Sequence, residues 1–215
     1  MTNGIGFKRI MAYFIDLLII SFIASMLSKV NAINPNINEY EKTMKAYTAY
    51  STELQESFGN TTVSPSDIIT PEYKGFMYDL GYYGISFAVI EFSVIILYFT
   101  FFPLLFNGQT IGKKLMKIRI VNDDETAKVP FYKYLIRSLL IPMFTGFVLY
   151  TSLFKIINTL LLLGLNVDQY FKMNLIVTLI FCIYAYADIF VMFARNDKKS
   201  LHDLITKTSI IAIEK

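Results

Sequence analysis

Cysteine and histidine are nearly absent from this 215-residue sequence, which contains one of each. A single cysteine, Cys182, excludes a disulfide within the chain, and one cysteine with one histidine cannot build a zinc site. We therefore expect no metal and no cofactor, and we interpret Cys182 as a buried, inert thiol. His202 stands next to Asp203, but a lone pair of this kind without a serine or cysteine nucleophile does not indicate catalysis, so no enzyme is predicted.

Charged residues are also scarce, at 17% of the sequence, whereas 54% of the residues are hydrophobic and the mean hydropathy is +0.48. Four stretches of 20 to 25 residues, at 10–30, 82–106, 135–154 and 173–193, contain only five of the 37 charges. At about 1.5 Å per residue, each can cross a hydrocarbon core of about 30 Å. The sequence therefore predicts an all-α, multi-pass protein of the lipid bilayer, with four transmembrane helices in one domain over residues 1–215.

The distribution of basic residues predicts the orientation of these helices. Segments 1–9, 107–134 and 194–215 contain 13 lysines and arginines in 59 residues, whereas segments 31–81 and 155–172 contain five in 69. Because basic residues near the ends of spans favour the cytoplasmic side, both termini should be cytoplasmic. The net charge of +3 is modest, and the lysines do not gather with aromatic residues on a soluble face, so a nucleic-acid partner is not expected.

The third stretch is the least regular of the four. Pro142 can kink it, and Lys155 is followed by an apolar run at 156–165 that is too short to cross a membrane alone. This run is either a continuation of the third span or an interfacial helix on the outer side. An arrangement with five spans is the alternative to four.

The external loop at 31–81 contains a pattern that predicts an amphipathic helix. Residues that are mostly apolar or aromatic recur at alternating steps of four and three. They are Tyr40, Met44, Tyr47, Ser51, Leu54 and Phe58. Asn38 and Glu41 match a capping box at its start. The helix either packs against the outer ends of the spans and the membrane surface or presents a site for a protein partner.

Segments 107–134 and 194–215 are expected to form one cytoplasmic cap. Residues 117–121 alternate between polar and apolar, and residues 208–213 are rich in β-branched side chains, so each predicts a short strand. A lone short strand is not stable in water, and we therefore expect the two to pair like a hairpin beneath the membrane. Gly108 and Gly112 precede lysines in this cap, but their spacing does not match a phosphate-binding loop.

Three acidic residues lie inside the predicted spans, where a charge costs about 2.5 to 3.5 kcal/mol on insertion scales. Asp16 and Asp188 lie at similar depths, about 8 to 9 Å from the inner boundary. Each has an arginine seven residues nearer to that boundary, Arg9 and Arg195 respectively. We expect a layer of acids beside a layer of arginines, which forms either a static polar network or a site for a transported ion.

Glu91, the third acid, lies near the middle of the second span. Its span contains no basic residue, so burial should favour the protonated carboxyl. Asp16, Glu91 and Asp188 are therefore the candidate residues of an ion or proton pathway, with Glu91 as the candidate proton carrier.

Three short blocks of sequence, in their order along the chain, resemble the pattern of a known family. They are Gly6-Phe7-Lys8-Arg9 with Ala12-Tyr13-Phe14-Ile15-Asp16, the segment 107–115 that contains Gly108 and Gly112, and Ser200-Leu201-His202-Asp203-Leu204. The set resembles the RDD family of bacterial membrane proteins, which is named for an arginine and two aspartates. The resemblance assigns these three positions to Arg9, Asp16 and Asp203, and matches Arg137 to an arginine that enters the next helix. It implies an ionic core of Arg9, Arg137 and Asp203 in the cap that also contains His202 and Arg195, with Asp16 just above this core.

The resemblance implies a role in transport, with cation–proton exchange as one form. We predict a small transporter of the bacterial cell membrane that exchanges a monovalent cation for protons. Four spans are few for enclosing a path, so a homo-oligomer is expected. The alternative is a noncatalytic accessory, immunity or partner protein that acts through the outer helix or the cap.

The charge distribution makes a direct prediction about topology. A reporter fused after Thr62 should be external, whereas reporters fused after Lys128 and Lys215 should be cytoplasmic. A cytoplasmic signal at Thr62 would contradict the orientation, and a change of side at Lys215 alone would favour five spans.

Overall fold

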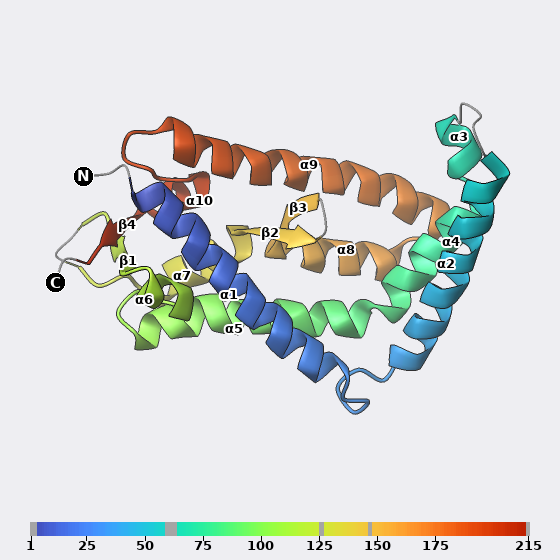
Figure 1. The fold of residues 1–215 in the computed structure, drawn as a ribbon, viewed down its shortest axis with the longest axis horizontal. Helices are drawn as coiled ribbons and strands as arrows, with labels where there is room; N and C mark the ends of the chain where they lie inside the picture. The colour runs from blue at the N-terminus through green and yellow to red at the C-terminus, as the bar shows by residue number, and fades with distance from the viewer. Residues whose placement is uncertain (1–3, 59–63, 125–126, 146–147, 214–215) are drawn as a thin grey trace.

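Three long apolar helices form the body of the protein. A computed structural model describes residues 4–58, 64–124, 127–145 and 148–213. Within these residues, α1 (Ile5–Ser28), α5 (Ile85–Leu105) and α9 (Val167–Ala194) are long and apolar enough to cross a membrane. In Figure 1, α9 and α5 run along opposite sides of the molecule and α1 crosses the space between them obliquely. The prediction of a mainly helical, multi-pass membrane protein is confirmed at this level.

The predicted third span is wrong as a continuous helix. Residues 135–154 instead contain the end of α7 (Phe131–Leu140), a hairpin of β2 (Pro142–Thr145) and β3 (Val148–Thr151), and the start of α8 (Ser152–Gly164). The break occurs because the residue before a proline is disfavoured in helical conformation, and Ile141 has an extended backbone with ψ of 130°. Pro142 therefore ends the helix instead of kinking it. The apolar run 156–165 lies mostly in α8, whose 13 residues are too few to cross alone.

The hairpin is packed inside the protein, between α9 and the other helices (Figure 1). Met143, Leu149 and Tyr150 are each no more than 6% exposed. Met143 and Tyr150 join a hydrophobic core built mainly from α1 and α5. Its remaining buried members are Ile20, Ile90, Val94, Ile95, Tyr98 and Phe99. Backbone outside a helix has polar groups that lipid cannot satisfy, so this protein shell lets the hairpin lie at the depth of the helices.

The cap brings together segments that are far apart in the sequence. It contains α6 (Ile111–Leu115), β1 (Ile118–Asn122), α10 (Leu201–Thr206) and β4 (Thr208–Ala212). The strands pair antiparallel from Ile118 opposite Ala212 to Asn122 opposite Thr208, which confirms the pairing expected from their composition. The start of α1 lies at the same end of the molecule as this sheet (Figure 1).

At the opposite end, α2 (Ile37–Phe58) packs on α4 (Pro71–Tyr83), and α3 (Pro65–Ile68) is a short turn between them. The helix expected in this loop is therefore present, but it begins at Ile37, so the predicted cap at Asn38 is wrong. Tyr47 and Tyr50 of α2 contact Phe76 of α4 by their rings. No residue of α2 is buried.

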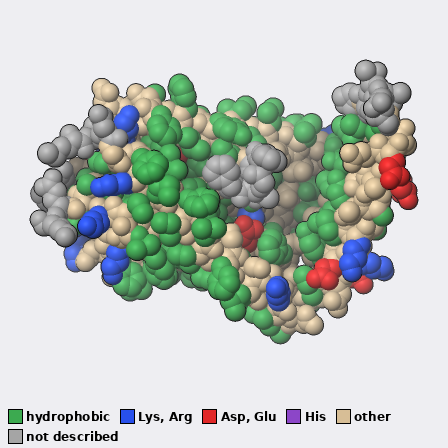
Figure 2. All heavy atoms as spheres, in the orientation of Figure 1, with side chains coloured by type: hydrophobic (Ala, Val, Ile, Leu, Met, Phe, Trp, Pro, Cys, Tyr) green, Lys and Arg blue, Asp and Glu red, His purple; other side chains and the backbone are tan. Residues whose placement is uncertain are grey.

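Hydrophobic and charged side chains occupy different parts of the surface along the molecule. Figure 2 shows hydrophobic side chains over most of the middle of this face, with lysine and arginine side chains gathered at the cap end. Charged side chains of both signs lie at the end where α2 and α4 meet (Figures 1 and 2). This distribution is the one expected when the middle of a protein contacts lipid and its two ends contact water.

Candidate functional site

The centre of the cap is the carboxylate of Asp203, which is fully buried between two arginines. Its Oδ2 accepts a hydrogen bond from Arg9 Nη2 at 2.6 Å, and its Oδ1 accepts one from Arg137 Nη1. Oδ2 also accepts the backbone N–H of Ser200 at 3.0 Å, as part of the capping box that starts α10. The structure thus places together the three residues of the expected ionic core, from α1, α7 and α10.

The surroundings of Asp203 strongly favour its charged form. Burial alone would raise the pKa of this carboxyl, but the charges of Arg137 and Arg9, with His202 and the N–H of Ser200, hold the pKa well below its usual range. A depressed folded-state pKa stabilises the protein above the pH at which the unfolded aspartate titrates. This contribution is lost as the pH falls towards the folded-state value.

Asp16 lies in α1 and has partners from two other helices and the loop before one of them. Its Oδ1 accepts the Tyr98 hydroxyl at 2.6 Å and the Gly112 N–H at 2.7 Å, while its Oδ2 accepts the Thr110 hydroxyl at 2.5 Å. Lys113 Nζ is 3.8 Å from Oδ2. The carboxylate is fully buried, so its hydrogen-bonding capacity is used to hold α5 and α6 against α1.

Gly112 is required where α6 approaches α1 most closely. A Cβ atom at this position would overlap the carbonyl oxygen of Ala12 and lie 2.8 Å from Asp16 Oδ1. Gly108 meets a second backbone constraint, because its φ of +86° is in the region that favours glycine. Both glycines therefore shape the loop that presents hydrogen-bond donors to Asp16.

Asp188, near the end of α9, is held by His202 rather than by an arginine. Its Oδ1 accepts the backbone N–H of His202 at 2.8 Å, and the ring Nδ1 lies 2.9 Å from Oδ1 and 3.0 Å from Oδ2. The other ring nitrogen, Nε2, is 3.6 Å from Asp203 Oδ1. The only histidine in the sequence thus lies between two buried carboxylates.

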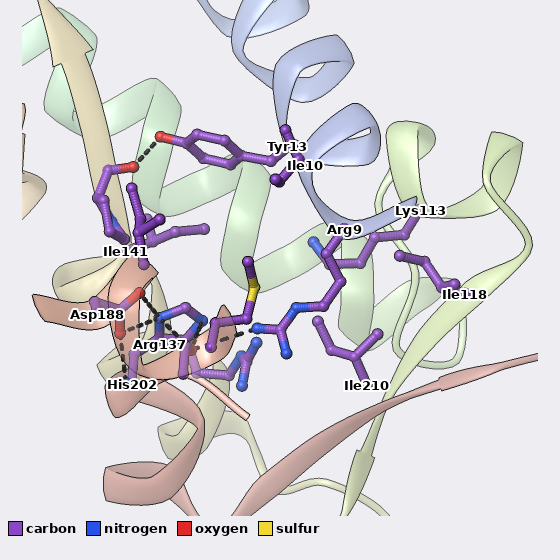
Figure 3. Close-up of a pocket in the computed structure, with 14 residues that line it drawn as sticks. Arg9, Ile10, Tyr13, Lys113, Ile118, Arg137, Ile141, Asp188, His202 and Ile210 are labelled. Carbon is purple, nitrogen blue, oxygen red and sulfur yellow. Dashed lines mark hydrogen bonds and ion pairs between the residues drawn. The ribbon is translucent and has the colours of Figure 1, made fainter. Parts of the chain in front are cut away.

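A cavity of about 250 Å³ lies against this pair, between α1, α9 and the cap. Figure 3 shows Asp188 and His202 on one side, with Arg9 and Lys113 extending towards the same space from α1 and α6. The rest of the lining is mainly apolar. Its aliphatic and thioether members include Ile10, Ile118, Ile141, Ile189, Met192 and Ile210. The cavity therefore joins a charged wall to a hydrophobic one.

Three expectations about charged residues are wrong. Glu91 was expected to have no cation nearby, yet Lys155 of α8 forms an ion pair with its Oε2, and the side chains are only 12% and 20% exposed for Lys155 and Glu91. Arg195 does not join the arginine layer, because its side chain is 44% exposed and binds Asp197 at 2.7 Å. Asp16 likewise pairs with Lys113 instead of an arginine.

Sequence reasoning missed several partners of these acids, namely Tyr98, Thr110, Lys113 and Lys155. Lys155 could have been recognised from the sequence, because it is the only basic residue between Arg137 and Lys172 and lies in an apolar segment. An isolated base and an isolated acid such as Glu91 are good candidates for a pair, because each is costly alone in a membrane. Tyr98 offered no comparable signal among the many aromatic residues of its helix.

Three long apolar helices with buried ionic groups at one end define a multi-pass membrane protein. The chain belongs to the RDD family, whose pattern matches residues 6–207 and so covers nearly its whole length. No curated protein and no solved structure matched the chain.

The buried core of the cap makes a prediction about stability. Asp203→Asn should lower the free energy of unfolding by about 3 to 5 kcal/mol, because it leaves two buried guanidinium groups without their carboxylate. Asp197→Asn removes the exposed partner of Arg195 and serves as the matched control, with little expected change. Denaturation of the purified variants in detergent measures both, and equal stability of the two variants would show that Asp203 is not a structural centre.

The contact between α6 and α1 leads to a second prediction about stability. Gly112→Ala should destabilise the protein by about 1 to 3 kcal/mol, since the added methyl group must displace the backbone of α1. Gly75→Ala in α4 is the control, because no atom lies within 4 Å of its Cβ position and alanine is the better helix former. Thermal unfolding in detergent should separate the two, and a neutral Gly112→Ala would mean that α6 does not pack so closely.

Proposed function

We propose that this protein is a small membrane transporter that couples the movement of a solute to the movement of a proton. The observation that carries the proposal is the pairing of Asp188 with His202 at the wall of the cavity. Histidine is the side chain that ordinarily changes charge between about pH 5 and 8. The proposed proton carrier is therefore this pair, in place of Glu91, which Lys155 already neutralises.

The charges around the cavity support exchange with a monovalent cation. Arg9, Lys113 and Arg137 are formally balanced by the three carboxylates of Asp16, Asp188 and Asp203. A proton on His202 or one bound monovalent cation would change this balance equally, so the two would compete for the site. Competition of this kind is the requirement for exchange in opposite directions.

Two buried hydroxyl groups support a polar route from the cavity towards the hairpin. Among the described residues, Tyr184 OH and Thr151 Oγ1 have no hydrogen-bond partner. Tyr184 lies one helical turn before Asp188 on α9, and Thr151 ends β3, which packs against α9. Buried polar atoms without protein partners are commonly satisfied by water, so water molecules could extend the route inward from Asp188.

The broken segment is proposed to complete a fourth crossing. α7, the β2–β3 hairpin and α8 together continue from the cap to the end where α4 lies (Figure 1). Interrupted helices at the centre of a membrane are a recurring feature of transporter sites. With four crossings, both termini lie on one side, which the lysine and arginine distribution assigns to the cytoplasm. A homo-oligomer remains part of the proposal, since so few helices enclose little space.

Flux measurements on purified protein in sealed liposomes test the proposal. A pH gradient should drive Na⁺ or K⁺ flux in the wild type, and His202→Gln should abolish the coupling because glutamine cannot carry the proton. Glu91→Gln should keep pH-dependent flux if the carrier is the Asp188–His202 pair. Lys114→Gln, at an exposed position of the cap, is the control.

The opposite pattern has a definite meaning. If Glu91→Gln lost the coupling and His202→Gln kept it, Glu91 would be the proton carrier instead of the Asp188–His202 pair. Absence of flux in the wild type for a panel of monovalent cations, with or without a pH gradient, would contradict cation–proton exchange.

A noncatalytic accessory or immunity-type role is the second candidate, and the exposure of α2 favours it. This helix has 22 residues, none buried, and is held mainly by aromatic contacts to α4. A helix of this kind offers a long surface to a protein partner. Photo-crosslinkers placed along its exposed face, for example at Lys45 and Thr52, would capture a partner in cells, whereas their failure to do so would count against this role.

A further inference from the structure

We infer that the cavity beside Asp188 and His202 binds an amphiphilic monoanion, a carboxylate or phosphate group on a short apolar body. The inference concerns binding and does not require transport. It goes beyond the proposed exchange of a monovalent cation because it assigns a different chemical class of ligand to the cavity. Four features of the cavity support it, namely the unused donors of Arg137, the excess of cationic side chains in the lining, the apolar wall and the size.

In the cationic wall, Arg137 has hydrogen-bond donors for which no partner is found among the described residues. Arg9, Lys113 and Arg137 all line the cavity and are each less than 9% exposed. Within the described residues, Arg137 donates only through Nη1, to Asp203 and Thr208, which leaves its Nε and Nη2 hydrogens unused. Guanidinium and ammonium groups bind carboxylate and phosphate oxygens through charge-assisted hydrogen bonds. An anionic group would therefore complete the hydrogen bonding of Arg137, which the protein satisfies only in part.

Three of the four lysine, arginine and aspartate side chains that line the cavity are cationic, namely Arg9, Lys113 and Arg137. Among the described residues that line the cavity, Asp188 is the only one with a carboxylate, and the oxygens of Asp16 and Asp203 already accept hydrogen bonds from other side chains. Burial lowers the pKa of Lys113 to about 8, and the charges of Arg137 and Arg9 add to this effect against the opposing influence of Asp16. An anion would relieve the repulsion among these three cations.

The other wall of the cavity suits a hydrocarbon body. Isoleucines and Met192 from α1, α9, the two cap strands and the residue after α7 contribute most of it. The volume of about 250 Å³ is larger than needed for a single ion. It exceeds the roughly 150 Å³ that holds a benzene molecule and lies below the roughly 300 Å³ at which pockets for drug-sized ligands begin. A ligand with a chain of several carbon atoms fits these limits.

The position of the cavity offers two sources for such a ligand. Ile10 of α1 lines the cavity and is 40% exposed. The rim of the cavity therefore lies on a helix that is long and apolar enough to cross the membrane. An anionic lipid could reach it from the bilayer, and a free short-chain acid from the cap side. In either case a proton on His202 would favour binding of the anion.

Titration calorimetry with octanoate tests the inference on the full-length protein in a nonionic detergent. Octanoate should bind at least about tenfold more tightly than octanol, which has the same chain without the charge. Lys113→Gln should weaken octanoate binding about tenfold, whereas Lys114→Gln, its exposed neighbour, should not. Ile10→Trp narrows the cavity without changing a charge and should also weaken octanoate binding. This second variant keeps the inference testable if Lys113→Gln does not fold.

The pH dependence gives a second readout. Octanoate affinity should fall as the pH rises through about 8, where Lys113 loses its proton, and this step should be absent in Lys113→Gln. The groups that act on Lys113 are Asp16 and Arg9 from α1, Arg137 from α7 and Asp203 from α10. Tyr98 of α5 donates a hydrogen bond from its hydroxyl to Asp16.

Native mass spectrometry with phosphatidylglycerol separates the two sources. A retained lipid that octanoate displaces identifies the bilayer as the source, and octanoate binding without a retained lipid identifies a free acid. Equal binding of octanol and octanoate, or no binding of either probe by the wild type, would overturn the inference. Because binding is measured without flux, an absence of transport would not by itself affect this result.

Discussion

The buried carboxylate of Asp203 is the constraint on which the rest of the cap depends. It satisfies Arg9 from α1 and Arg137 from α7, and without it two buried guanidinium groups would lose their counter-charge. Its place in the capping box of α10 also fixes the residue before it. His202 is thereby directed to Asp188 of α9, so the structural centre of the cap positions the titratable pair.

The acids inside the long helices have different roles despite their similar chemistry. Asp16 has three hydrogen-bond donors and a lysine around it, which suits a joint between α1, α5 and α6. Glu91 is neutralised by Lys155 and links α5 to α8. Asp188 differs from both because it combines a titratable partner with a cavity. Contact with the cavity therefore distinguishes Asp188, the candidate for chemistry, from the two acids that join helices.

The sequence predicted what depends on composition and period, and missed what depends on long-range contacts. Long apolar segments gave three helices correctly, and β-branched residues gave the pairing of β1 with β4. The break at Pro142 could not be distinguished from a kink, because the outcome depends on whether the surrounding helices can bury a hairpin. Motif resemblance grouped Arg9 with Asp203, which are 194 residues apart, but no local pattern related His202 to Asp188 or Lys155 to Glu91.

A double-mutant cycle between Arg137 and Asp203 tests the central claim most directly. The unfolding free energies of the wild type, Arg137→Gln, Asp203→Asn and the double variant would be measured in the same detergent. If the carboxylate and guanidinium groups stabilise the cap through each other, the two single variants should each lose much of the same stability. The sum of their losses in unfolding free energy should then exceed the loss in the double variant by about 1 to 3 kcal/mol. Effects that add within about 0.5 kcal/mol would show that the two residues act independently, which would contradict an ionic centre at Asp203.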